Sequence, residues 1–199
     1  QNSMSDRFSI CYVAKSGYND CLRNVIGHPE YLLQLLQGMP EDSPMLKPGQ
    51  QSEYMSLMLE NMHYFKNKPE RLVALHGDFW GANVFFRKDG SIFVIDYSRM
   101  PWGDVGFDIG FWTSVYLMSY HRGNSKYYKQ LGEYFLNSYI SKTNDKEVIK
   151  TMVYSLGLVA AMYASSKWVP GIDDKHRISF VNHVMKMLRE KKFSWEYKE

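Results

Sequence analysis

The chain is poor in cysteine, and its two cysteines are not placed as metal ligands. Cys11 and Cys21 are the only ones among 199 residues, and they form neither a CxxC pair nor the cysteine–histidine spacing of a zinc site. Two free thiols are typical of a reducing compartment. No charged start followed by an apolar core marks a signal peptide. The sequence therefore predicts a cytoplasmic protein.

Long apolar runs and dense charge are also missing. The most apolar stretch, residues 152–164, is interrupted by Ser155 and Gly157. It is shorter than the roughly 20 residues that span a bilayer, so we expect a buried core helix and no membrane partner. The net charge is only +3, and the basic residues are spread along the chain. Basic residues spread in this way do not form the basic patch that is typical of a nucleic-acid-binding protein.

Several enzyme signatures are absent as well. The sequence has no G-x-G-x-x-G loop, no Walker A motif, no G-x-S-x-G elbow and no HExxH pair. The last two absences leave a serine hydrolase and a zinc protease without support. The first two absences mean that these 199 residues contain no recognisable glycine-rich loop for binding phosphates.

What is present predicts one folded α+β domain. The hydrophobic fraction of 45% and the aromatic fraction of 16% are ample for a core. Segments 84–86 and 92–95 are β-branched and aromatic, as strands are, and the proline- and glycine-bearing segment 38–51 predicts a loop. Apolar residues at helical spacing predict helices over about 30–36, 53–65, 109–120, 127–141, 146–168 and 175–191.

A hairpin is predicted between the two strands. Asp89-Gly90 is a strong signal for a two-residue type I′ turn, because both central residues need positive φ. A two-residue loop there places Asn83 directly opposite Asp96. Opposed residues share a face of the sheet, with Cβ atoms about 5 Å apart. The open end of an apolar hairpin would thus carry an amide and a carboxylate together.

Asp78 lies five residues before Asn83, in "LHGDFWGANVFF". Carboxylate and amide oxygens are the ligands that Mg²⁺ takes in proteins. A further carboxylate beside a metal-bound phosphate can orient a hydroxyl group and accept its proton. The alternative is structural, because aspartate and asparagine at strand ends commonly form turns. The hairpin that joins the three positions favours the functional interpretation.

These residues resemble the catalytic core of the aminoglycoside phosphotransferase and choline kinase-like family, relatives of the protein kinases. The "HGD" motif stands in place of H-R-D, with the same spacing from aspartate to asparagine and a later aspartate after a hairpin. The resemblance implies that Asp78 is the catalytic base, and that Asn83 and Asp96 bind Mg²⁺ and, through it, ATP. It also implies that His76 and Asp108 support the catalytic loop, with Asp108 buried and accepting backbone hydrogen bonds.

The resemblance implies that residues 1–199 are the mostly helical C-terminal lobe of a kinase-like fold, with the small nucleotide-binding lobe outside this chain. Lys15, in "YVAKS", is similar to a phosphate-binding strand lysine, but no glycine-rich loop precedes it. Asp96 is followed by Tyr-Ser rather than Phe-Gly, which makes protein-kinase activity less expected. The implied activity is ATP- and Mg²⁺-dependent phosphate transfer to a small-molecule alcohol, inactive in this lobe alone.

In that family the acceptor docks against the C-terminal helices. Candidate contacts here, each equally suited to an ordinary surface or core role, are Trp102, Glu133, Asp173 and Asp174. The pattern specifies neither the acceptor nor the oligomeric state.

Two other functions fit parts of the sequence. A kinase-like module could act as a non-catalytic binding or scaffold protein, although the intact aspartates and asparagine of the motif argue against degeneration. A metal-dependent hydrolase would use Asp78, Asp96, Asp104 and His76, but no second histidine ligand lies nearby.

Overall fold

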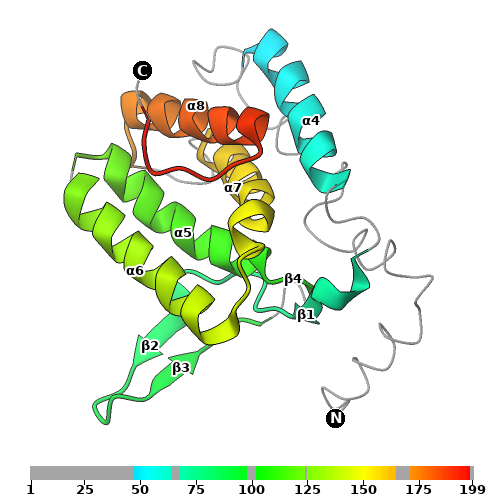
Figure 1. The fold of residues 1–199 in the computed structure, drawn as a ribbon. Helices are drawn as coiled ribbons and strands as arrows, with labels where there is room; N and C mark the ends of the chain where they lie inside the picture. The colour runs from blue at the N-terminus through cyan, green and yellow to red at the C-terminus, as the bar shows by residue number, and fades with distance from the viewer. Residues whose placement is uncertain (1–46, 64–67, 98–101, 124, 165–170, 198–199) are drawn as a thin grey trace.

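The computed structural model describes residues 47–63, 68–97, 102–123, 125–164 and 171–197. Helices dominate this part of the chain, and two small antiparallel sheets lie at one end of them (Figure 1). The helices are α4 (Pro48–His63), α5 (Gly106–His121), α6 (Ser125–Thr143), α7 (Val148–Ala164) and α8 (Asp174–Glu190). The strands are β1 (Leu72–Ala74), β2 (Val84–Phe86), β3 (Ile92–Val94) and β4 (Trp102–Asp104). The predicted α+β class, a helical lobe with a small hairpin, is confirmed.

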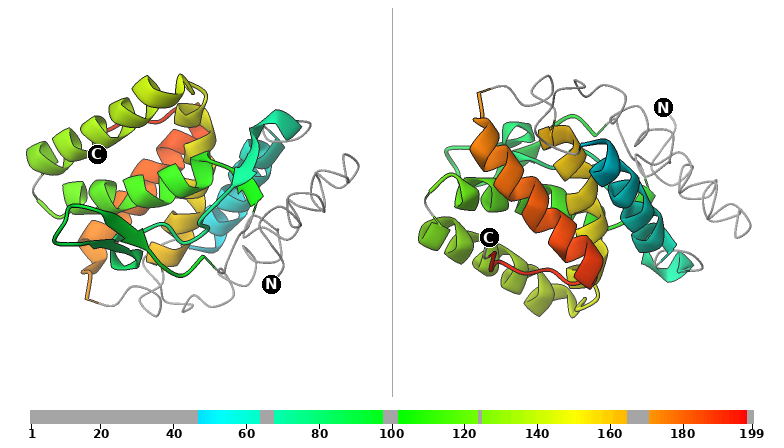
Figure 2. Two further views of the ribbon diagram at one scale, coloured as in Figure 1. Left: turned by 90° about the horizontal axis from the view of Figure 1, so that it is seen from below. Right: turned by 90° about the horizontal axis from the view of Figure 1, so that it is seen from above.

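Helix α7 is the centre of the core. Its residues from Thr151 to Ala161 are buried, and it packs between α5, α8 and α4 (Figure 2). On the α4 side, the hydroxyl group of Tyr54 donates to the carbonyl of Gly157 at 2.7 Å. The prediction of a buried core helix is confirmed. Within the described residues, no helix is both long and apolar enough to cross a membrane.

Two glycines bring the start of α5 against α7. A Cβ atom added at Gly106 would lie 2.1 Å from Oγ1 of Thr151, and one added at Gly110 would lie 2.7 Å from the carbonyl oxygen of Met152. Only glycine permits so close an approach without displacing the neighbouring helix. The first turn of α5, which carries Asp108, is therefore held firmly on the core.

Some helix boundaries differ from those predicted. Helix α4 begins at Pro48, so residues 48–51, predicted as loop, are helical. Proline suits the first helical position, where its missing N–H group would have no partner. The side chain of Gln50 accepts from the N–H group of Lys47 at 3.1 Å and helps to close this end. The predicted helix at 30–36, Lys15 and both cysteines lie outside the described residues.

Strands β1 and β4 pair antiparallel, with the register Leu72↔Asp104, Val73↔Gly103 and Ala74↔Trp102. The sequence did not predict β4, because "WGD" contains two residues that are uncommon in strands. The ladder brings the segment before the HGD motif (residues 76–78) beside the segment that leads into α5. It therefore joins the two pieces of chain from which the site is built.

The β2–β3 hairpin forms, but its predicted loop is wrong. The register is Val84↔Val94, Phe85↔Phe93 and Phe86↔Ile92. The N–H group of Arg87 donates to the carbonyl of Ser91 at 2.9 Å, so three residues rather than two make the loop. Gly90 has a φ of 82°, as expected of the left-handed residue that ends a three-residue loop. The extra loop residue shifts every cross-strand pair by one position.

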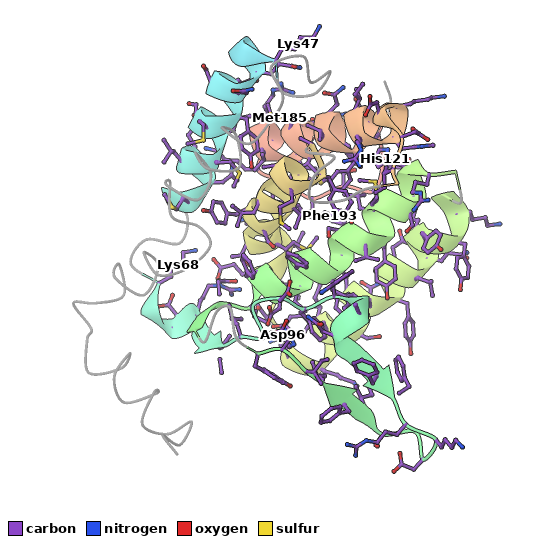
Figure 3. The ribbon with its side chains drawn as sticks, turned by 180° about the vertical axis from the view of Figure 1, so that it is seen from behind. Lys47, Lys68, Asp96, His121, Met185 and Phe193 are labelled. Carbon is purple, nitrogen blue, oxygen red and sulfur yellow. The ribbon has the colours of Figure 1, made fainter. Side chains whose placement is uncertain are left out.

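A pair of histidines, His183 buried and His121 half-buried, lies at the other end of α5. Nε2 of His121 lies 3.0 Å from Nδ1 of His183 on α8, and Tyr197 stacks on His183. Burial lowers the pKa of His121 to about 4 and that of His183 to about 3. Both rings are therefore neutral near pH 7, which suits a packing role. Figure 3 shows His121 well separated from Asp96 and the hairpin.

Candidate functional site

The first turn of α5 holds the loop at His76 and Gly77 through Asp108. The backbone N–H group of His76 donates to Oδ2 of Asp108 at 2.7 Å, and that of Gly77 donates to Oδ1 at 2.9 Å. Asp108 is half-buried, and its burial raises its pKa against the opposing effect of the two donors. The two backbone hydrogen bonds are present as predicted, whereas the predicted burial of Asp108 is wrong, because the residue is only half-buried at the start of α5. Gly77, with a φ of 79°, makes the turn that presents both N–H groups to one carboxylate.

His76 joins the loop to the end of β3. Its Nδ1 accepts the N–H group of Asp78 at 3.1 Å, so Nε2 must carry the proton that it donates to the carbonyl of Ile95 at 2.7 Å. The imidazole is buried and lies beside the rings of Phe79 and Tyr97. With both nitrogens engaged, His76 supports the loop, and neither nitrogen is left to carry a proton for a substrate.

Asp78 and Asn83 meet inside the loop. Nδ2 of Asn83 donates to the backbone carbonyl of Asp78 at 2.9 Å and to its carboxylate Oδ2 at 3.3 Å. Both side chains are 8% exposed. A short 3₁₀ helix (Gly81–Asn83) returns the chain so that this contact can form. Since the amide nitrogen faces Asp78, the amide oxygen of Asn83 is turned away from it.

Asp96 follows directly after the last ladder bond of the hairpin. The N–H group of Ile95 donates to the carbonyl of Asn83 at 3.0 Å, so Asn83 lies opposite Ile95 and not opposite Asp96 as predicted. The longer loop causes this shift. Asp96 has a φ of 62°, which interrupts the strand's alternation, and its side chain is exposed. Figure 3 shows Asp96 where the hairpin meets the helical body.

The left-handed backbone at Asp96 is itself informative. A non-glycine residue in this region costs about 1–3 kcal/mol, and such residues gather at functional sites. The strain is placed one residue after the ladder that ends at Asn83. It takes Asp96 out of the hairpin's regular alternation, at the end of the hairpin where Asn83 contacts Asp78.

The donor set fits a hard cation. An amide oxygen at Asn83 and a carboxylate at Asp96 are oxygen ligands of the kind that Mg²⁺ accepts, and Mg²⁺ usually keeps waters and phosphate oxygens in its remaining positions. Among the described residues, no three histidine, cysteine, aspartate or glutamate side chains gather as a metal cage.

Asp104, the other carboxylate of that hydrolase hypothesis, has a structural role. Arg71, just before β1, binds it through both Nε and Nη2, and Arg71 also binds Asp145 at 2.9 Å and Glu147 at 3.2 Å. Burial opposes the positive charge, but Asp104 and Asp145 outweigh it, and the pKa of Arg71 is raised. No local pattern could have found this network, because its three carboxylates lie 33 to 76 residues from Arg71 in the sequence.

The predicted acceptor contacts are spread over the fold. The backbone of Trp102 pairs with Ala74 in β4, and Glu133 lies on α6, 3.9 Å from Lys129. Asp173 caps α8 by accepting the N–H group of His176 at 3.0 Å, and Asp174 begins that helix. Figure 1 shows α8 at the opposite end from the hairpin. This capping role accounts for an aspartate at position 173 without any contact to an acceptor.

Sequence reasoning missed a row of aromatic side chains beside Asp78. Phe79 lies 4.8 Å from Trp112, measured between ring centroids, and Trp112 lies 6.1 Å from Phe135. Tyr116 completes the row one turn along α5. The spacing of Trp112 and Tyr116, four residues apart on a predicted helix, was the only signal in the sequence.

A family comparison agrees with this geometry. The model of the phosphotransferase enzyme family matches residues 24–140, more than half of the chain and all of the loop, hairpin and α5. No curated protein and no solved structure matched the chain. The chain belongs to the phosphotransferase enzyme family, and the resemblance to aminoglycoside phosphotransferases and choline kinases is confirmed at the level of the family.

Proposed function

We propose that this member of the phosphotransferase enzyme family transfers the γ-phosphate of ATP, with Mg²⁺, to a hydroxyl group of a small molecule. The observation that carries the proposal is the buried contact between Asp78 and Asn83 at the end of the ladder that leads to Asp96. The two proposed metal ligands, Asn83 and Asp96, and the proposed base, Asp78, belong to segments that meet at the same end of the hairpin. Phosphoryl transfer depends chiefly on such positioning and on charge neutralisation.

Each residue has a distinct role in this proposal. The amide oxygen of Asn83 and the carboxylate of Asp96 would hold Mg²⁺, which neutralises charge on the phosphate oxygens when bound. Asp78 receives the proton of the acceptor hydroxyl. The hydrogen bond from Asn83 to Oδ2 of Asp78 fixes the orientation of that carboxylate. His76 and Asp108 hold the loop backbone in place.

We also propose that a nucleotide-binding lobe, not described in this structure, packs over the hairpin. The apolar side chains of the hairpin are exposed among the described residues: Phe86 is 75% exposed and Ile92 is 60% exposed. Phe85 and Phe93, on the other face, are each 48% exposed. An exposed apolar patch at this position is typical of an interaction site.

The test is a transfer assay in the full-length protein with Mg·ATP and a broad panel of alcohols. We expect a phosphorylated alcohol, detected by phosphorus NMR, that requires both Mg²⁺ and the acceptor. The 199-residue chain alone should fold but transfer phosphate far more slowly, because the described residues supply no glycine-rich loop for the phosphates. Fast transfer by this chain alone would contradict the two-lobe proposal. Mg·ATP binding without transfer to any alcohol would favour the inactive scaffold.

A further inference from the structure

The C-terminal segment 192–197 forms a strap over the helices. It leaves the end of α8 and runs back beside that helix, as the dark red trace in Figure 1 shows. Within the strap, Phe193 is 9% exposed and Trp195 is 7% exposed, and their ring centroids lie 5.2 Å apart. Both side chains belong to the hydrophobic core, although the strap contains neither helix nor strand. Burial of its side chains therefore holds the strap in place.

A glycine on α6 admits the middle of the strap. A Cβ atom added at Gly132 would lie 2.1 Å from Cη2 and 2.3 Å from Cζ2 of Trp195. Only glycine lets the indole ring lie so close to the backbone of α6. The next residue of the strap, Glu196, forms an ion pair with Lys129 of the same helix. The closed strap thus has a defined binding position on α6.

The end of the strap packs on the histidine pair, which consists of His121 on α5 and His183 on α8. Tyr197 stacks on His183, with 4.9 Å between the ring centroids and 26° between the planes, and its ring lies 5.8 Å from that of His121. His183 is 0% exposed, and Nε2 of His121 lies 3.0 Å from its Nδ1. Nδ1 of His121 lies 2.9 Å from the hydroxyl oxygen of Ser179. The strap and two helices therefore surround the pair together.

The contact between the two rings depends on their protonation. One nitrogen must donate its hydrogen, and the other must accept it through a lone pair. When both rings are protonated, every ring nitrogen carries a hydrogen, so two N–H groups would face each other and the bond would be lost. A single added proton places a charge in the same enclosed space, where burial disfavours it. Protonation therefore works against the closed arrangement.

Burial is the largest cause of the lowered pKa of both histidines, and neighbouring positive charge adds to it. His176 lowers the pKa of His121 further, and Lys186 acts in the same direction on His183. Glu196 on the strap acts in the opposite direction on His183. The titratable groups around the pair are Tyr120 on α5, His176 and Lys186 on α8, and Glu196 and Tyr197 on the strap. The balance keeps both rings neutral in the closed structure.

We propose that residues 192–197 are a pH-sensitive strap, which is closed over the histidine pair while both rings are neutral and opens when the pair takes up protons. Opening withdraws Trp195 from Gly132 and lets water reach the charged imidazoles. The proposal concerns the end of α5 away from Asp108, and it does not depend on the phosphotransferase function.

The direction and range of the response follow from linkage. In the closed structure the pKa of His121 is lowered to about 4, whereas an exposed histidine titrates near about 6.5. The closed strap is therefore fully favoured above about pH 6.5 and loses this advantage as the pH falls toward about 4. If opening exposes the ring fully, His121 alone lowers the ratio of closed to open strap about thirtyfold between pH 7.5 and pH 5.

The experiment is fluorine NMR of the full-length protein labelled with 5-fluorotryptophan, from pH 7.5 to pH 4.5. The signal of Trp195 is the one that is missing in Trp195→Phe. We expect it to move toward the position of a solvent-exposed fluorotryptophan as the pH falls, while the far-UV circular dichroism stays constant. A signal that does not move, or that moves only together with loss of the helices, would overturn the proposed strap.

Substitutions identify the groups that respond to pH. In the double variant His121→Gln and His183→Gln, the Trp195 signal should keep its neutral-pH position throughout. His176→Gln, which removes a histidine of α8 outside the pair, is the matched control and should leave the response largely intact. Glu196→Gln tests the other titratable contact of the strap. A response that disappears in Glu196→Gln and persists in the double variant would contradict the proposal.

A reciprocal measurement does not require the histidine variants to fold. Trp195→Ala should open the strap at neutral pH, so the pKa values of both histidines, followed by proton–carbon NMR, should rise toward about 6.5. Tyr197→Ala, which removes only the ring stacked on His183, should raise the pKa of His183 by less. Tyr134→Leu, an exposed aromatic side chain of α6 outside the strap, is the control and should leave both pKa values low. Low values that persist in both folded strap variants would contradict the coupling between the strap and the pair.

Discussion

Replacing Asp78 with asparagine is expected to slow phosphate transfer by about 10²–10⁴-fold, because a positioned general base supplies a factor of that size. The substitution keeps the side chain's shape but removes the group that accepts the hydroxyl proton. Asp78 contacts Asn83 through Oδ2, and an amide at this position can preserve the packing of the loop. The affinity for Mg·ATP should therefore be largely unchanged, since Asp78 is not one of the proposed metal ligands.

The measurement is kcat for an alcohol acceptor together with the Kd for ATP at saturating Mg²⁺, in the full-length protein. Asp89→Asn is the matched control, because Asp89 is an exposed carboxylate at the hairpin tip whose contact with Ser91 an amide can replace. Unchanged kcat in Asp78→Asn would contradict the assignment of the base. A parallel loss of ATP affinity would instead place Asp78 among the metal ligands.

The second large effect is expected on stability. Asp108→Ala removes the acceptor of two backbone N–H groups, those of His76 and Gly77. Leaving a buried donor unsatisfied costs about 1–3 kcal/mol, so the two together should lower the free energy of unfolding by a few kcal/mol. The raised pKa of Asp108 indicates that burial already disfavours its charge, which keeps the loss at this moderate size.

Thermal unfolding and amide hydrogen exchange at His76 and Gly77 measure this effect. Asp108→Asn keeps one acceptor oxygen and should lose less stability than Asp108→Ala. Asp174→Ala, which removes an exposed carboxylate from the first turn of α8, should be nearly neutral. An unchanged melting temperature in Asp108→Ala, with protected loop amides, would show that Asp108 does not hold the catalytic loop.

The local parts of the site could be predicted from the sequence. The helices, the two hairpin strands and the contact of Asp108 with the loop follow from periodicity and from a short motif with a known resemblance. The loop length could not be predicted, because Asp89-Gly90 is compatible with both a two-residue turn and a three-residue turn that ends in a left-handed glycine. The observed φ of 82° at Gly90 belongs to the second.

Contacts between distant segments were not predictable. The pairing of β1 with β4 and the ion pairs of Arg71 join residues that are far apart in the sequence. Neither produces a pattern within a short stretch of sequence that could have predicted it. The contact of Phe79 with Trp112 has the same character, because one ring lies on the loop and the other on α5. Periodicity reports which face of a helix is apolar, but not which loop that face meets.

The central claim is that Asn83 and Asp96 hold one Mg²⁺ while Asp78 serves the acceptor. The most direct measurement is the Kd for ATP as a function of Mg²⁺ concentration, determined by calorimetry for the full-length protein, Asp96→Asn and Asp78→Asn. Asp96→Asn should lose most of the gain in ATP affinity that Mg²⁺ produces, because it removes a charged ligand. Asp78→Asn should retain that gain. If the Mg²⁺ dependence of Asp96→Asn coincides with that of the unsubstituted protein, Asp96 is not a metal ligand and the proposed phosphoryl-transfer site is contradicted.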